Sequence, residues 1–152
     1  MADPSDRLVD VTDAVYQAVL AKKVDVGLQD VWFGEHDKLP RLPAVCVIGD
    51  TKEREDRGAP RLVTNTFRVR CDLYVVKIST QADIDRDALT LADDLEEVLH
   101  EDLTFGGIVI GSLVRSNEQG VVDKAGTRYR TARLTLELIN RTMLPMRPGY
   151  NQ

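Results

Sequence analysis

The feature that most constrains this chain is a run of alternating residues at 62–78, followed by the pattern of one amphipathic helix up to Leu103. Successive side chains of a strand point to opposite faces, so the run predicts one strand with a core face and a polar face. Natural strands usually run about 3 to 10 residues. We therefore expect this strand to extend beyond the core and project as an arm. The apolar residues that share its core face are Val63, Phe67, Val69, Cys71, Leu73 and Val75.

The first fifty residues predict a helix and two strands. An apolar stripe at steps of three and four residues indicates a helix that Asp3 or Ser5 can cap. The run 31–33 predicts a short strand before the proline-containing loop LPRLP. The next strand, 43–50, is apolar on both faces and must be covered on both sides. The stripe of the helix consists of Leu8, Val11, Val15, Ala18 and Val19.

The charged segment 51–61, TKEREDRGAPR, predicts the exposed tip of a long hairpin. It joins the strand at 43–50 to the long strand. Hairpin register then places residues 45–50 beside residues 68–73. Residues near 52–65 are left beyond the core, so the predicted arm is a hairpin of two strands.

The second half of the chain predicts a helix and two more strands. Thr80 and Asp83 resemble a capping box, and the glycines at 106–107 are expected to end the helix. A strand at 108–114, apolar on both faces, and an alternating strand at 127–140 follow, with a polar turn between them. The inward stripe of the helix is Ile84, Ala88, Leu91, Leu95, Val98 and Leu99.

These elements define the fold class. The order α-β-β-β-α-β-β predicts an α+β domain at 1–142 with a mostly antiparallel, mixed sheet and two main helices, and an extended tail at 143–152. Two strands are apolar on both sides, and only two good helices are available to cover them. Either the helices divide between the two faces, or a second subunit supplies the missing cover. We therefore expect the chain to form oligomers.

Charge and composition exclude several classes of protein. The chain has 20 basic and 25 acidic side chains and a net charge of -5, which does not favour long-range attraction to nucleic acid or anionic membranes. The N-terminus has no apolar signal region, and no run approaches the ~20 apolar residues of a membrane span. These features predict a cytosolic protein or one assembled in the cytosol. Cys46 and Cys71 lack the spacing of a zinc or redox pair and are expected to be buried thiols.

No catalytic or metal-binding motif stands out. Asp83, Asp85 and Asp87 resemble the start of a calcium loop, but Ala88 replaces the required glycine. The chain has no phosphate cradle and no nucleophile motif, and its His36 fits no metal-ligand pattern. We therefore predict no enzyme activity, no metal and no cofactor.

The polar face of the sheet carries three arginines, Arg68, Arg70 and Arg133. They could contact phosphates, but Asp72 and Glu137 share their face and no aromatic side chain is interleaved for base stacking. Ion pairs across the strands are the favoured interpretation. A nucleic-acid binder remains an alternative, and it predicts affinity that falls steeply with salt.

The order of elements resembles that of the tail terminator proteins of long-tailed bacteriophages. The segments that carry the resemblance are PAVCVIGDTKERE, the long strand closing in LYVV, the helix IDRDALTLADDLEEVLHEDL and the last strand RTARLTLELINRT. It spans residues 11–142 and lies in pattern and length, not in a catalytic motif. The resemblance implies a small subunit of a ring, taken to be a hexamer, at the head-proximal end of the tail tube in the virion. Such a ring stops tube growth and docks to the head-tail connector, without a cofactor or catalysis.

This resemblance implies three partners: further copies of the chain, the major tail tube protein and the connector or stopper protein. DNA can pass through the ring, and no membrane is involved. The alternatives are another ring protein of the phage neck, or a small host enzyme or ligand-binding module. From the projecting hairpin and the tail we predict the contacts with a neighbouring subunit or the tube at Lys52, Glu53, Arg54, Glu55, Asp56, Arg57, Arg61, Met143, Leu144, Met146 and Tyr150.

Overall fold

The computed structural model describes residues 6–56, 62–77 and 84–143. It is an α+β fold with one mixed sheet, as the sequence predicts, and the strands of this sheet lie in the order β1-β2-β3-β5-β4. Among the described strands, β1 and β2 pair in parallel, and the other neighbouring strands pair antiparallel. The elements are α1 (Leu8–Ala21), α2 (Lys23–Val26), β1 (Asp30–Phe33), β2 (Ala44–Asp56), β3 (Leu62–Lys77), α3 (Ile84–Leu99), β4 (Gly111–Lys124) and β5 (Thr127–Met143).

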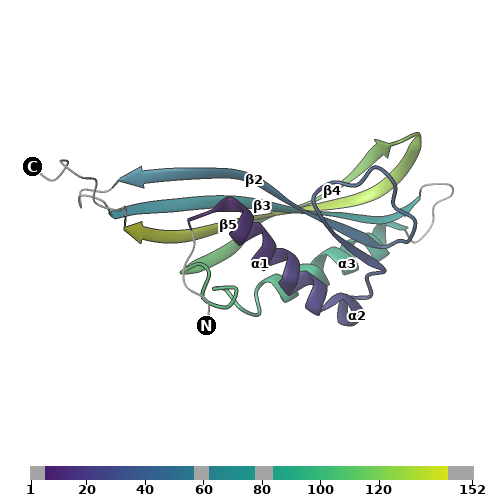
Figure 1. The fold of residues 1–152 in the computed structure, drawn as a ribbon. Coiled ribbons are helices and arrows are strands. Elements are labelled where there is room, and N and C mark those ends of the chain that lie inside the picture. The colour runs from purple at the N-terminus through teal and green to yellow at the C-terminus, as the bar shows by residue number, and fades with distance from the viewer. Residues whose placement is uncertain (1–5, 57–61, 78–83, 144–152) are drawn as a thin grey trace, which may run out of the picture.

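The described helices, α1, α2 and α3, lie on one face of the sheet (Figure 1). The α1 stripe and the α3 stripe pack on the apolar face of β3 and β5, and the expected alternation of β3 is confirmed by its burial. Val15 of α1, Leu95 of α3 and Leu134 of β5 are completely buried in this core. The main core therefore forms between one sheet face and two helices.

The opposite face of β2 has a different cover. Ala44 and Cys46 are buried there with Tyr74 and Tyr129, under Leu39 of the loop that joins β1 to β2. The expectation that this strand is covered on both sides is confirmed. However, the cover of the second face comes neither from a helix nor from a second subunit. The loop between β1 and β2 provides it within the same chain.

Both cysteines are free and buried, as predicted. Burial raises the pKa of Cys71 to about 12 and also raises the pKa of Cys46. Because the thiolate is the nucleophile, these thiols are unreactive at neutral pH.

Three strands run past their predicted ends: β5 by three residues, to Met143, and β2 and β4 by more. β2 continues through the charged residues 51–56, which we expected in the hairpin tip, because they pair with β3 up to Asp56 opposite Val63. β4 begins at Gly111 and runs to Lys124, so most of the expected polar turn is strand and only Ala125 and Gly126 connect it to β5. Pairing along long partner strands decides both outcomes, although the local residues are polar. Moreover, β4 is not doubly buried, since Leu113 is 44% exposed.

The helix ends also differ from prediction. The N-cap position of α1 is Arg7, which makes no side-chain capping hydrogen bond. The predicted caps of the two helices, Asp3 or Ser5 and the pair Thr80 and Asp83, lie outside the described residues. α3 ends at Leu99, before the glycines that were expected to terminate it. Those glycines adopt positive φ angles in a following turn. None of the described helices is long and apolar enough to span a membrane.

Asp102 organises the turn after α3. Its carboxylate accepts hydrogen bonds from the backbone N–H of Thr104 (3.0 Å), the Thr104 hydroxyl (2.9 Å) and the backbone N–H of Gly106 (2.9 Å). These bonds, led by that from Gly106, lower the pKa of Asp102. The turn then leads to β4, where the Val114 N–H donates to His100 Nε2 at 3.2 Å.

We expect Asp102→Ala to lower the free energy of unfolding by about 1 kcal/mol at pH 7, a small value because the carboxylate is exposed. The lowered pKa means that the stabilisation is complete above the ordinary aspartate pKa of about 3.9 and is lost as the pH falls through the folded-state pKa. Urea unfolding of both proteins between pH 3 and 7 measures the difference. Asp102→Asn, which keeps an acceptor oxygen without the charge, is the control. A stability difference that does not shrink toward pH 3 would contradict this account.

Candidate assembly surface

The arm has three strands. β2, β3 and β5 run together beyond the layer of helices (Figure 1). At its outer end Asp56 pairs with Val63, and Leu62 pairs with Met143. The sequence predicted an arm of two strands, and this prediction is wrong because β5 is its third strand. Met143, assigned from the sequence to an extended tail, is the last residue of β5.

A buried polar pair lies inside this arm. Asn65 and Asn140 are opposite each other in the register of β3 and β5, and both are completely buried. Asn65 Oδ1 accepts from Arg54 Nε at 3.1 Å, and its Nδ2 donates to Thr142 Oγ1 at 3.0 Å. Arg54 also pairs with Asp6, just before α1, at 3.2 Å. Because buried polar groups are costly unless bonded, this network fixes the register of the arm and ties it to the N-terminal segment.

The predicted contact residues divide into two groups. The first lies on the arm, where the side chains of Lys52, Glu53, Arg54 and Glu55 are exposed on β2 and Met143 is 60% exposed at the end of β5. Asp56 closes β2. The second group lies outside the described residues: Arg57, Arg61, Leu144, Met146 and Tyr150.

The arginine face carries ion pairs across the strands. Arg133 Nε of β5 lies 2.8 Å from Asp72 Oδ1 of β3, and within β3 itself Arg70 Nε lies 3.2 Å from Asp72 Oδ2. Arg68 pairs with Glu137 at 3.6 Å. Asp72 is only 6% exposed, so its two arginine partners are needed to compensate its burial. The predicted cross-strand pairing is confirmed, and these arginines are already engaged within the chain.

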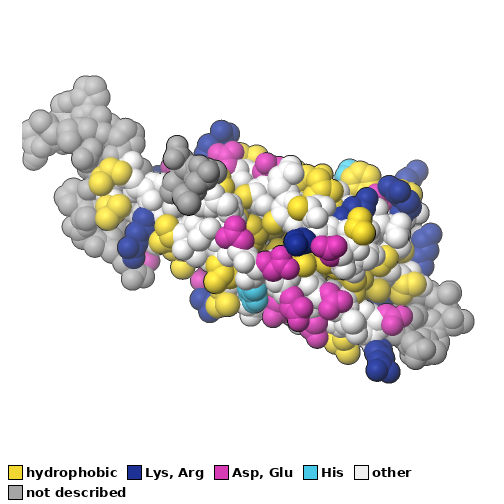
Figure 2. Space-filling model, turned by 90° about the horizontal axis from the view of Figure 1, so that it is seen from below, with side chains coloured by type: hydrophobic (Ala, Val, Ile, Leu, Met, Phe, Trp, Pro, Cys, Tyr) yellow, Lys and Arg dark blue, Asp and Glu magenta, His cyan; other side chains and the backbone are white. Residues whose placement is uncertain are grey.

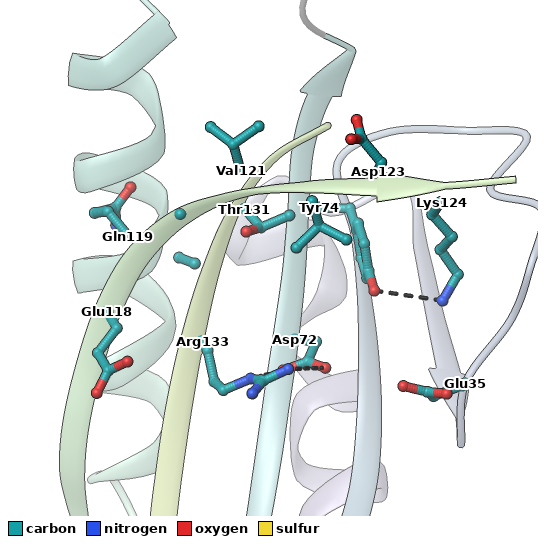
Figure 3. A pocket seen from close by; sticks show the side chains of 13 residues that line it. Glu35, Asp72, Tyr74, Glu118, Gln119, Val121, Asp123, Lys124, Thr131 and Arg133 are labelled. Atoms are coloured by element: carbon teal, nitrogen blue, oxygen red, sulfur yellow. Dashed lines mark hydrogen bonds and ion pairs between the residues drawn. The ribbon is translucent and has the colours of Figure 1, made fainter. Parts of the chain in front are cut away.

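A groove of about 370 Å³ lies on the same face, where β4 curves over the end of the sheet (Figure 3). Lys124 Nζ donates to the Tyr74 hydroxyl at 3.4 Å and lies 5.3 Å from the centre of that ring. Burial raises the pKa of Tyr74. Tyr74 therefore stays protonated at neutral pH, which is opposite to the requirement for a general base. No pattern in the sequence predicts this groove, because residues of β3, β4 and β5 that are far apart in the chain line it.

The helix face is acidic (Figure 2). Exposed carboxylates of α3 and the following turn gather there, and Asn117 of β4 donates to Asp93 at 3.3 Å and to Glu96 at 3.2 Å. Among the described residues, no cluster of side chains could hold a metal ion. The calcium-loop pattern cannot be followed further, since Asp83 and the side chain of Asp85 lie outside that part of the chain.

Comparisons with known proteins add little. No family model matches the sequence, and no curated protein matches it. Among the solved structures that this chain resembles, one is similar over 93% of this chain and 99% of its own, with 16% identity and a TM-score of 0.45.

Proposed function

We propose that this chain is a ring-forming tail terminator of a long-tailed bacteriophage. In this role, copies of the chain, taken to be six, cap the head-proximal end of the tail tube. The ring stops elongation of the tube and presents its other side to the head-tail connector. DNA passes through the opening without sequence-specific contact, and the protein acts by assembly, without a cofactor.

The observation that carries this proposal is the three-stranded arm. A monomer needs only the sheet that its helices cover, yet β2, β3 and β5 continue past them (Figure 1). The strands of the arm pair in a defined register, because the completely buried Asn65 is hydrogen-bonded to Arg54 and Thr142. Such a rigid projection, with exposed charges and an exposed Met143 at its end, suits a contact with a neighbouring subunit or the tube.

A shortened arm tests the proposal. Arg54 and Asn65 are opposite in register, so replacing residues 55–64 by Asn-Gly joins them through a two-residue hairpin turn. We expect this variant to fold and to lose capping, so that tail tubes polymerise in its presence to uncontrolled lengths. Electron microscopy of tubes assembled with either protein measures the length distribution.

The matched control is Arg128→Ala, which changes an exposed residue at the opposite end of the sheet. It should cap tubes like the original protein. Normal tube lengths with the shortened arm would remove the arm from the mechanism. If the intact protein joins filled heads but does not cap tubes, it is instead a connector or stopper of the neck.

A further inference from the structure

The sheet presents two outer edges, one on each side. β1 covers β2 only at residues 44–47, and within the described part of the chain no strand lies outside residues 48–54. On the other side β4 is the last strand along its whole length, at Gly111–Lys124. Exposed strand edges offer backbone N–H and C=O groups to another chain.

The two edges have compatible directions. β2 is antiparallel to β3, β3 to β5, and β5 to β4, so β2 and β4 run in opposite directions. If a second copy continues the sheet in the same orientation, its β2 lies antiparallel to β4 of the first copy. This is a head-to-tail contact, which repeats from copy to copy and gives a ring if the rotation closes.

The charges on the polar face are complementary. Glu53 of β2 lies on this face, where it pairs with Arg68 at 3.7 Å, and its side chain is 68% exposed. On β4, Arg115 lies on the same face, where it pairs with Glu137 at 3.0 Å, and its side chain is 56% exposed. An acidic edge of β2 would therefore meet a basic position on β4.

On the helix side the signs are reversed. Lys52 and Arg54 of β2 point to this side, because they alternate with Glu53. Beside β4 the same side carries the acids Asp93 and Glu96, both bonded to Asn117. A second copy turned over would place acid beside acid on one face, so the charges select one orientation of the pairing.

We propose that copies of this chain associate in solution by pairing β2 of one copy with β4 of the next. This pairing names the subunit contact of the proposed terminator ring. It rests on the proposed function in one respect, that the contacts close into a ring. Opposite charges specify the partner edge. They are Glu53 and Arg115 on the polar face, and Lys52 and the acids of α3 on the helix side.

Charge reversal tests the pairing. We expect Glu53→Arg alone and Arg115→Glu alone to weaken self-association by on the order of tenfold or more, because each places like charges in contact. The double variant should return to within a few-fold of the original. Sedimentation velocity over a range of protein concentration measures the assembly, and circular dichroism checks that each variant is folded. Arg86→Glu on α3, at an exposed position beside Pro43 and Val75 and not at either proposed edge, is the matched control.

The outcomes separate this inference from the proposed function. An original chain that stays monomeric at all concentrations overturns the pairing, as do single reversals that leave assembly unchanged or a double variant that fails to recover. Those results leave tube capping to its own test. Conversely, a chain that assembles through these edges but does not cap tubes supports the pairing and overturns the terminator role.

Discussion

Phe67→Ala is expected to lower the free energy of unfolding by about 3 to 5 kcal/mol, the usual cost of truncating a buried phenylalanine. Phe67 is completely buried in the main core. It lies in the central β3, between Lys52 of β2 and Leu138 of β5, where the arm joins the body. Since domains of this kind are stable by only about 5 to 15 kcal/mol in total, the variant should be marginally folded at 37 °C. Urea unfolding followed by circular dichroism measures the loss.

Phe33→Ala is the matched control. Phe33 is 45% exposed at the end of β1 and makes one edge contact with Tyr16, with 5.7 Å between ring centres. Its truncation should cost only about 0.5 to 1.5 kcal/mol. Equal losses for the two phenylalanines would show that the base of the arm is not part of the cooperative core.

The second large effect is expected at Gly49, where α1 packs directly against β2. A Cβ at this position would lie 2.5 Å from Thr12 Oγ1 and 3.3 Å from Leu8 Cγ. Thr12 is held there by the hydrogen bond that its hydroxyl donates to the Leu8 carbonyl at 2.7 Å. Gly49→Ala must therefore push α1 away from β2 or break that bond, and we expect a loss of about 1 to 3 kcal/mol. Thermal and urea unfolding measure it.

Two further variants isolate the cause. Gly111→Ala in β4 should be nearly neutral, because a Cβ there meets no atom within 4 Å. Combining Gly49→Ala with Thr12→Ala should recover part of the stability that the two single changes lose together, since the clashing oxygen is gone. Strict additivity of the two losses would refute the close contact as the source of the effect.

The features that were predictable from the sequence are those with a local physical signal. The period of two in β3 predicts which of its faces is buried, because alternation follows from strand geometry alone. The helical stripes predict α1 and α3 in the same way. Of the arm, the two strands that are neighbours in sequence were found, together with the register that places residues 45–50 beside 68–73.

The features that were missed depend on distant segments. The polar stretch 115–124 has no strand pattern of its own, and it is a strand because β5 offers it a continuous partner. The third strand of the arm could not be inferred, since the pairing of Leu62 with Met143 joins residues 81 positions apart in the chain. The groove at Tyr74 and Lys124 arises in the same way from β3 and β4.

The sequence by itself therefore determined an α+β chain with an overlong alternating strand, two amphipathic helices and buried thiols, because side-chain periodicity and burial preference act over a few residues. Only the tertiary structure decided that both helices lie on one face, that a loop covers the other face of β2, and that three strands build the arm. Those outcomes depend on which backbone edges pair and which surfaces meet. These pairings and contacts join segments far apart in the chain, and no local sequence pattern predicts them.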